Sequence, residues 1–554
     1  MNENYLKIIS LGGFGQVTKN MFVYETLKDI LIVDCGVGFP EQDMLGVDLV
    51  VPDVSYLLEK QEKIRGLILS HGHDDHIGGL PYFLPQLKKE IPIYGPKWAV
   101  GLSKMKLEEF EITADLKEFD ENTKLQLGEF SLEFIEVTHS IPDTYHLVIK
   151  TPVGVVYHAA DFKLDLQPVM GQPANQEKIK KVGQLEVLCL LSDCLRSENS
   201  GFTPPEVKIK EMFESEISNC QGKFVVTTMS SNISRWKLAI DVSLVHKRKI
   251  VLVGRTIEKN MALAQKLKYL EYPEDIFVKR NKMQQYADNE LTFLVAGSQA
   301  QIGSSLDKIV AGDVPNLEIK ANDKIIFSTD YIPGNESAIY RLIDNIYRLG
   351  GEVIYQDIHS NVHVSGHGSQ GDLGKLMDMV RPKYLIPIGG NFRHMYAYQK
   401  LAISRGFKKQ QVIIMDNDQV VEFDNQARMK VYYGLETREI MVDALGVGDV
   451  GKVVLRDRKI LSEEGMVVVV ISLDQKTFQL VDEPEVISRG FVYIKENFDL
   501  INQTKKKIHQ VIGEVQGKRT DTRSVRFKIQ EELEKFFQEK TGRRPMVLPV
   551  IIEA

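Results

Sequence analysis

Short apolar runs separated by polar or helical stretches make up the first two hundred residues of the chain. Four runs are rich in β-branched residues and mostly end at a turn or a polar cluster: Ile30–Val33, Ile64–Leu69, Leu132–Val137 and Val155–His158. Strands that alternate with helical stretches predict an α/β layered domain. In such domains the chemistry usually lies on loops that leave the strand ends.

The sequence pattern differs between Pro204 and Arg348. Strands are expected at Phe224–Thr228, Ile250–Val253 and Ile325–Ser328, with Gly-containing loops such as GRTIEKN and AGSQAQIGSS after them. From 352 to about 423 the chain returns to strands and His-rich loops. The pattern therefore predicts a second α/β unit inserted into the first.

The last part of the chain, from about Val442, has a pattern of its own. We expect a Gly-rich β region at ALGVGDVGKVVLRDRKI, a buried strand at Met466–Ile471 and a helix at Arg526–Lys540. The chain then ends in an apolar strand, PMVLPVIIEA. Such a strand needs a partner sheet, in its own domain or in a neighbouring subunit.

Size and composition fit a multi-domain globular protein. For 554 residues we expect about two to four domains, and 43% hydrophobic with 26% charged residues is typical of soluble chains. Apolar runs are too short to span a membrane, the N-terminus lacks a secretory pattern, and the four cysteines show no CxxC pairing. These features predict a cytoplasmic protein. The net charge of −7 is weak evidence against a nucleic-acid partner, because a phosphate-binding surface can be a small basic region of an acidic protein.

The strongest chemical signal is the heptapeptide SHGHDDH, which directly follows the predicted strand RGLIL and begins at Ser70. Its imidazoles and carboxylates suit zinc or a similar divalent ion. The alternative is a polar surface loop or a helix cap. Asp34, His139 and Asp161 also stand at strand ends, where each alone would more often be a turn or capping residue. Together they predict one site at the rim of a β-sandwich.

Six residues match, in order, the metal-ligand motifs of the metallo-β-lactamase superfamily: His71, His73, Asp75, His76, His139 and Asp161. Further segments resemble the β-CASP nucleases and the ribonuclease J family in particular: VTHSIPD, ADFKLD, SDCLRSE, MSSNISR, GRTIEKN, YIPGNE and HVSGHGSQGDL. LGVGDVGKVVLRDR, EVISRGFVY and TGRRPMVLPVIIEA are similar to the C-terminal domain of that family. The resemblance covers essentially the whole chain.

The resemblance implies an α/β fold, namely a metallo-β-lactamase αββα sandwich with an inserted β-CASP α/β domain and a small α+β C-terminal domain. The implied boundaries are 1–203 and 349–428 for the two parts of the metallo-β-lactamase domain, 204–348 for the insertion, 429–449 for a linker and 450–554 for the C-terminal domain. It also implies a homodimer or tetramer formed through the C-terminal domain, with a paralogous subunit as a further partner.

The same resemblance implies a metal-dependent ribonuclease, acting as endonuclease and as 5′→3′ exonuclease on single-stranded, 5′-monophosphorylated RNA in RNA decay and in rRNA and mRNA processing. His71, His73 and His139 would hold one ion, Asp75 and His76 a second, and Asp161 would bridge them. The implied catalytic residues are Asp75, His367 and Asp161. The implied substrate-binding residues are His363, Ser365, Gly366, Ser298 and Asp193. Zinc fits this donor set best, and manganese is the alternative.

The sequence departs from the family pattern in one place that bears on the metals. The family carries a histidine within PxHGE, whereas this chain has Gly389 at the histidine position and Asn391 in place of the glutamate. Glycine offers no side-chain ligand, so we expect the second ion to be weakly held, exchangeable or completed by water. His394 is a conceivable substitute. Ser234 also replaces a histidine in SNxHR, and GSQAQIG replaces a GSQGEP-like loop.

Three other functions compete with an active ribonuclease. A weakly active or non-catalytic subunit that supports an active paralogue is favoured by Gly389 and disfavoured by the complete HxHxDH cluster. A thioester or lactam hydrolase needs only the core domain, so this function would not explain the insertion or the C-terminal domain. A pure RNA-binding protein is disfavoured because no aromatic motif of the RNP type is present.

Overall fold

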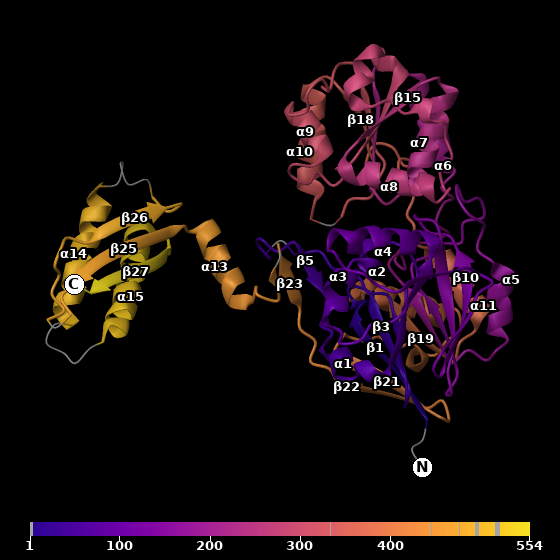
Figure 1. Ribbon diagram of the computed structural model, residues 1–554, viewed down its shortest axis with the longest axis horizontal. Helices are drawn as coiled ribbons and strands as arrows, with labels where there is room; N and C mark the ends of the chain where they lie inside the picture. Colours follow the sequence, from indigo (N-terminus) through magenta and orange to yellow (C-terminus); the bar gives the residue numbers. More distant parts are fainter. Residues whose placement is uncertain are drawn as a thin grey trace. The chain divides into compact units, whose positions relative to one another are not determined.

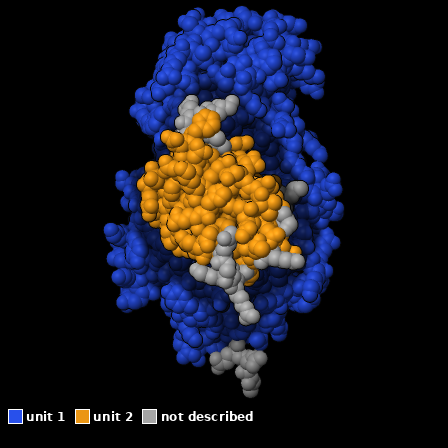
Figure 2. Space-filling view, turned by 90° about the vertical axis from the view of Figure 1, so that its left-hand side faces the viewer, with its two compact units in different colours: residues 1–39, 50–440 blue, residues 40–49, 441–554 orange. Residues whose placement is uncertain are grey.

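The computed structural model describes residues 4–41, 43–332, 334–444, 446–475, 477–492, 498–515 and 521–553. The chain forms two compact units, residues 1–39 with 50–440 and residues 40–49 with 441–554, which Figure 2 colours separately. Each unit has a hydrophobic core of its own. The candidate chemistry lies entirely in the first unit.

One layer of the first unit is an eight-stranded sheet with the order β22-β21-β1-β3-β4-β6-β7-β8. Its strands are β1 (Tyr5–Gly12), β3 (Met21–Glu25), β4 (Ile30–Val33), β6 (Ile64–Ile68), β7 (Ile93–Pro96), β8 (Leu116–Phe119), β21 (Gln419–Asp424) and β22 (Met429–Tyr433). Neighbours from β4 to β8 run parallel. Two of the strands expected from the sequence, at 30–33 and 64–69, are therefore neighbours with the same direction.

The second layer is a six-stranded sheet with the order β19-β13-β12-β11-β10-β9. Its strands are β9 (Lys124–Leu127), β10 (Phe130–Val137), β11 (Thr144–Lys150), β12 (Val155–Ala159), β13 (Cys189–Asp193) and β19 (Tyr384–Ile388). Buried side chains of both sheets, among them Phe22 and Phe134, form one core. β19 comes from the chain after the insertion and pairs with β13, which precedes the insertion. The segments before and after the insertion therefore form one sheet.

Helices cover the outer faces of this sandwich. α1 (Ser55–Glu59), α3 (Leu80–Phe83) and α4 (Lys97–Glu109) pack on the large sheet, whereas α5 (Gln176–Gly183), α11 (Gln370–Val380) and α12 (Phe392–Ser404) pack on the smaller one (Figure 1). Successive side chains of β1 point to opposite faces of the large sheet. Ile8 lies in the core between the two sheets, and Ile9 lies in the core between the large sheet and its helices. The predicted αββα sandwich is confirmed.

The insertion is a parallel five-stranded sheet with the order β15-β16-β14-β17-β18. Its strands are β14 (Phe224–Thr227), β15 (Lys249–Val253), β16 (Leu291–Val295), β17 (Lys324–Phe327) and β18 (Glu352–Ile354). One face packs on α6 (Lys208–Ser218), α7 (Ile233–Val245) and α8 (Arg255–Lys266), the other on α9 (Ser305–Ala311) and α10 (Glu336–Arg348) (Figure 1). The GRTIEKN segment differs from the expected loop, since only Gly254 (φ 131°) turns the chain and the rest begins α8.

The second unit contains the sheet β26-β25-β27, packed on two helices. β25 (Met466–Leu473) pairs with β26 (Glu485–Arg489) in antiparallel and with β27 (Met546–Glu553) in parallel register. The helices are α14 (Phe498–Val515) and α15 (Thr522–Thr541). The terminal strand thus has its partner within its own domain, which decides between the two alternatives left open by the sequence.

One expected element is wrong. The β region predicted at KVVLRDRKI is α13 (Lys452–Glu463), and only Gly446–Val447 forms a strand, β24. The pair Val453–Val454 favoured a strand, but apolar residues recur seven positions later at Ile460 and Leu461, which is a helical period. The expected linker at 429–449 also includes β22, β23 (Ile440–Asp443) and β24. Among the described helices, none has the length and apolar character of a membrane span.

Candidate metal centre

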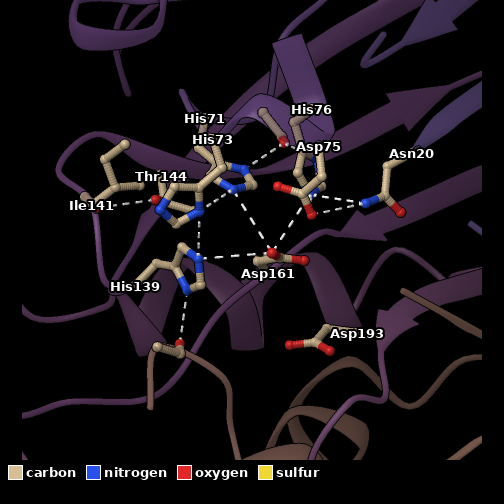
Figure 3. Close-up of polar contacts among 12 residues, drawn as sticks. Asn20, His71, His73, Asp75, His76, His139, Ile141, Thr144, Asp161 and Asp193 are labelled. Atoms are coloured by element: carbon tan, nitrogen blue, oxygen red, sulfur yellow. Dashed lines mark hydrogen bonds and ion pairs between the residues drawn. The ribbon is translucent and has the colours of Figure 1, made fainter. Parts of the chain in front are cut away.

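The candidate residues lie where strands of both sheets end (Figure 3). Asp34 directly follows β4, and the residues from Ser70 to His76 follow β6 and enter α2 (Asp74–Ile77). In the other sheet, His139 follows β10 and Asp161 follows β12. The single site that the sequence predicts at one rim of the sandwich therefore forms.

A first donor group comprises His71, His73, His139 and Asp161, whose potential ligand atoms all lie within 4.8 Å of one another. Nδ1 of His73 is 3.1 Å from Nε2 of His71 and 3.1 Å from Nε2 of His139. Both of these Nε2 atoms are 3.7 Å from Oδ2 of Asp161. Three nitrogens and one oxygen thus face a common point.

A second donor group comprises Asp75, His76 and again Asp161. Nε2 of His76 is 3.6 Å from Oδ2 of Asp75 and 3.4 Å from Oδ2 of Asp161. Figure 3 shows the Asp161 carboxylate between the two groups, with ion pairs to both. Asp161 is therefore placed to bridge two ions, as the resemblance implies.

Hydrogen bonds determine which ring nitrogens carry lone pairs. Nδ1 of His139 is 2.8 Å from the carbonyl oxygen of Gly366. Because a carbonyl only accepts, this nitrogen carries the proton and leaves Nε2 free to bind a cation. A Cβ on Gly366 would lie 2.6 Å from His139 Nδ1, so this close approach requires glycine.

Asp34 fixes two further rings. Its Oδ2 accepts from Nδ1 of His76 at 2.7 Å and from the Ser70 hydroxyl at 2.8 Å. Since that hydroxyl has donated its proton, Oγ of Ser70 accepts from Nδ1 of His71 at 3.0 Å. His71 and His76 therefore also turn their Nε2 atoms toward the centre. The positive φ of 62° at Asp34 aims its carboxylate back at this loop.

The pKa shifts agree with a cation-binding site. Burial lowers the pKa of His71 and His139 well below the usual value and that of His73 to about 4, so these rings are neutral at pH 7. Burial also acts on His76, but the surrounding carboxylates, chiefly Asp161, outweigh it and raise its pKa. The second donor group is therefore a negative environment that favours a cation.

These residues fit a divalent metal. Neutral imidazoles with outward nitrogens held by hydrogen bonds, together with a shared carboxylate, are the ligand and supporting-residue pattern of zinc and related ions. His71, His73 and His139 would hold the first ion, Asp75 and His76 the second, and Asp161 both.

A third group places His367 beside the metal residues. Its Nδ1 donates to Oδ2 of Asp193 at 2.8 Å, and its Nε2 is 3.8 Å from Oδ2 of Asp161. Burial lowers the pKa of His367, but Asp193 and then Asp161 outweigh it and bring the pKa to about 9. His367 is thus a protonated ring with one N–H directed at the centre.

The remaining predicted residues lie outside these groups. His363 has Nε2 at 3.3 Å from Oδ2 of Asp330, and the hydroxyl of Ser365 accepts from the amide of His367 at 3.2 Å. Ser298 is buried, with its hydroxyl 3.9 Å from the sulfur of Met229.

Gly389 directly follows β19 and borders Asp161, the carboxylate that the two donor groups share. Its φ is 62°, and a Cβ built there would lie 3.8 Å from Oδ1 of Asp161 with no other described atom within 4 Å. His394 does not replace the missing imidazole, because its Nδ1 accepts from the amide of Asn391 at 3.2 Å and its Nε2 is 3.5 Å from Glu198. Position 389 therefore offers no side-chain ligand beside Asp161, where the resemblance implies a histidine of the second site.

Sequence reasoning missed Asn20. Its amide nitrogen is 3.1 Å from Nε2 of His76 and 3.4 Å from Oδ2 of Asp75 (Figure 3). The residue stands in the segment before β3, more than fifty positions from the HxHxDH cluster, and carries no recognisable spacing. The pairing of β3 with β4 and backbone hydrogen bonds of Asn20 with Asp75 and Gly36 bring it to the site.

Replacing Asp34 with asparagine should weaken metal retention by about tenfold, because a supporting partner of a ligating histidine typically contributes 10- to 100-fold in affinity. Asparagine tolerates the positive φ at this position, so the backbone is preserved. Metal content after dialysis against a weak chelator would measure the loss. Unchanged content would show that Asp34 does not control the orientation of His76.

Family comparisons cover nearly the whole chain. Residues 15–178 match the metallo-β-lactamase superfamily, and residues 350–415 match the Zn-dependent metallo-hydrolase RNA specificity domain. Residues 221–346 match the ribonuclease J β-CASP domain and residues 453–554 the ribonuclease J C-terminal domain.

Full-length relatives give the same result. The chain is 35% identical to ribonuclease J2 of Bacillus subtilis (strain 168), covering 100% of this chain and 99% of that protein. It is 35% identical to ribonuclease J of Thermus thermophilus, covering 100% and 96%. A solved structure of a protein of unknown function from Enterococcus faecalis V583 covers 76% of this chain and 100% of its own at 15% identity and a TM-score of 0.52, which shows likeness of fold alone.

Proposed function

Because the chain belongs to the ribonuclease J family, a group of metallo-hydrolase ribonucleases, we propose that it hydrolyses single-stranded RNA with two divalent ions, of which zinc is the first choice. The proposal includes 5′→3′ exonuclease and endonuclease activity on 5′-monophosphorylated RNA, in RNA decay and in rRNA and mRNA processing. The observation that carries it is the pair of donor groups that share Asp161, with His367 beside them.

The side chains suit phosphodiester hydrolysis. Ions bound here would lower the pKa of a water and neutralise charge on the phosphate. Asp75 is placed to orient the attacking water, and burial raises its pKa to about 6. His367 would donate its Nε2 proton toward the phosphate or the leaving 3′-oxygen. Asp193 positions that ring through the 2.8 Å bond to its Nδ1.

The substrate-binding residues that we propose are His363, Ser365, Gly366, Ser298 and Asp193. Gly366 and Ser365 stand next to the metal residues, since the Gly366 carbonyl binds His139 and Ser365 binds the amide of His367. Backbone and hydroxyl groups in this loop would contact RNA phosphates. A preference for 5′-monophosphate follows if the loops at 297–298 and 363–366 bind the chain end.

The C-terminal domain supports a proposal of assembly. β27 pairs with β25 on one side and with no described strand on the other. Leu548, Val550 and Ile552 on this edge strand are 49%, 38% and 50% exposed. An exposed apolar edge favours pairing with another chain, so we propose a homodimer or tetramer formed through this domain. We also propose the domain boundaries of 1–203, 204–348, 349–428, 429–449 and 450–554, with two corrections from the sheets: β18 (Glu352–Ile354) extends the insertion to 354, and β22 (Met429–Tyr433) extends the metallo-β-lactamase domain to 433.

A second candidate function rests on Gly389. With the second donor group short of one ligand, the chain would be a weakly active or non-catalytic subunit that supports an active paralogue in a hetero-oligomer. The geometry favours activity over this alternative, because the six metal-type residues, the tautomers fixed by Asp34 and Gly366, and the His367–Asp193 pair are all in place.

The test is cleavage of 5′-end-labelled, 5′-monophosphorylated RNA by the purified chain. We expect release of labelled mononucleotide, loss of release with a chelator, and recovery on addition of zinc or manganese. A 5′-triphosphorylated substrate serves as the control for the end preference. Inactivity with every metal supplied would favour the supporting-subunit function, and mixing with the paralogue would then be the next experiment.

Replacing Asp193 with asparagine should move the alkaline limb of the pH–rate profile to lower pH. The Asp193 carboxylate is the largest cause that raises the pKa of His367, so its neutral isostere lowers that pKa while keeping an acceptor for Nδ1. His367 then loses its proton at a lower pH, and activity falls more at pH 8 than at pH 6.5. A profile of kcat/KM from pH 6 to 10 measures this, and a uniform loss at all pH values would argue against the role.

A further inference from the structure

The side-chain amide of Asn20 occupies the edge of the second donor group. Its terminal atom, assigned as Nδ2, is 3.1 Å from Nε2 of His76 and 3.4 Å from Oδ2 of Asp75 (Figure 3). These two atoms are the ones that would bind the second ion. The end of the Asn20 side chain therefore lies beside the donor atoms of both Asp75 and His76.

The main chain holds Asn20 at this point. Its amide donates to the carbonyl oxygen of Asp75 at 2.9 Å, and its carbonyl accepts from the amide of Gly36 at 2.9 Å. The residue is 2% exposed. The bound backbone fixes the position of the residue, and burial restricts its side chain. The two ends of an amide differ only in proton content, so either end fits the same position.

The spacing suits a ligand atom. Metal–ligand bonds of about 2.1 Å place neighbouring ligands about 3.0 Å apart in octahedral and about 3.4 Å apart in tetrahedral geometry. The amide end lies at 3.1 Å and 3.4 Å from the His76 and Asp75 donors, and those donors lie 3.4 to 3.6 Å from each other or from Asp161. These four separations are close to those expected between neighbouring ligands of one ion.

We propose that the carbonyl oxygen of Asn20 is a ligand of the second ion and makes this site selective for a hard divalent cation such as manganese or magnesium. The inference rests on the proposed two-ion site. The first site offers three imidazole nitrogens and one carboxylate, which suits zinc. The second would offer one imidazole nitrogen against three oxygens, from Asp75, Asp161 and Asn20, and carbonyl and carboxylate oxygens suit manganese and magnesium.

Turning Oδ1 toward the ion requires a rotation of the Asn20 amide. It gives up the contacts of Nδ2 to Asp75, to His76 and to the carbonyl oxygen of Val17, and places Oδ1 about 3.3 Å from that carbonyl, so the bond to the ion has to offset this contact. An imidazole at position 389 would instead have made the site richer in nitrogen. The glycine there therefore changes the preferred metal as well as the number of ligands.

Metal content tests the inference independently of RNA cleavage. The metal-free full chain is loaded with equal concentrations of zinc and manganese, passed through a desalting column and analysed by mass spectrometry, with manganese followed by electron paramagnetic resonance. We expect one zinc with manganese as the second ion in the wild type. Asn20→Ala should lower manganese affinity at least about tenfold and leave zinc unchanged, whereas Asn20→Asp should retain manganese.

Asn417→Ala is the matched control. Asn417 accepts from the hydroxyl of Ser10 at 3.0 Å and from the amide of Phe14 at 3.2 Å, so its loss loosens the same segment without removing an atom near the ion. It should retain manganese. Equal manganese in Asn20→Ala and the wild type, or zinc at both sites of the wild type, would overturn the proposal. Zinc retention in each variant reports that the fold is intact.

Discussion

Replacing His76 with alanine is expected to abolish metal-dependent release of mononucleotide from 5′-monophosphorylated RNA, with a loss of roughly 10³-fold or more. His76 contributes the only imidazole of the second donor group, and its Nε2 lies within 3.6 Å of both carboxylates there. Without it, Asp75 and Asp161 face each other with no nitrogen ligand between them. The measurement is the rate of release with zinc or manganese supplied.

A matched substitution separates this effect from general damage. His509→Ala removes an exposed histidine of the second unit whose Nε2 pairs with Glu483 at 3.1 Å, and it should leave the rate unchanged. Metal analysis of His76→Ala should show one retained ion, because the first donor group does not include this residue. Residual activity within tenfold of the wild type would mean that the second ion does not take part in cleavage.

Replacing Gly389 with histidine is expected to raise affinity for the second ion at least about tenfold and to increase turnover at low metal concentration. Supporting partners of metal ligands already contribute 10- to 100-fold, and a direct ligand should contribute no less. The position is open, with a Cβ 3.8 Å from Oδ1 of Asp161. The backbone φ of 62° costs a non-glycine residue about 1–2 kcal/mol, so the metal-free variant should melt at a lower temperature.

Gly389→Ala controls for that strain. It carries the same backbone cost without an imidazole, so it should lose thermal stability and gain neither metal nor turnover. Metal titrations followed by calorimetry, with RNA cleavage measured in parallel, compare the three chains. If the histidine variant gained no affinity over the alanine variant, the missing ligand would not be the cause of weak second-site binding.

The sequence was sufficient to predict the fold and most of the centre. Short β-branched runs mark β4, β6, β10 and β12 within two residues of their ends, since such runs have few alternatives to a buried strand. The HxHxDH cluster is local, so its ligands could be identified before any long-range contact was known. Their positions at strand ends singled out His139 and Asp161, whereas His367 came from the family resemblance.

What the sequence could not predict depends on contacts between distant strands. Asn20 has no spacing relation to His76, and it comes near through the pairing of β3 with β4 and through backbone hydrogen bonds with Asp75 and Gly36. The lone-pair direction of His139 depends on the Gly366 carbonyl, 227 positions later. The failure at α13 has a different cause, because two adjacent valines outweighed a seven-residue period that was present in the sequence.

The contact between His139 and Gly366 has a consequence during synthesis. The ribosome completes all six metal-type residues by Asp161, but the insertion must be made before the carbonyl of Gly366 and the ring of His367 exist. A nascent chain that ends before Gly366 also lacks β19, so its smaller sheet is missing one of the six strands. The complete set of contacts around the centre therefore forms only after the insertion has been made, and a prematurely terminated product carries the metal-type residues without His367, the proton donor that we propose.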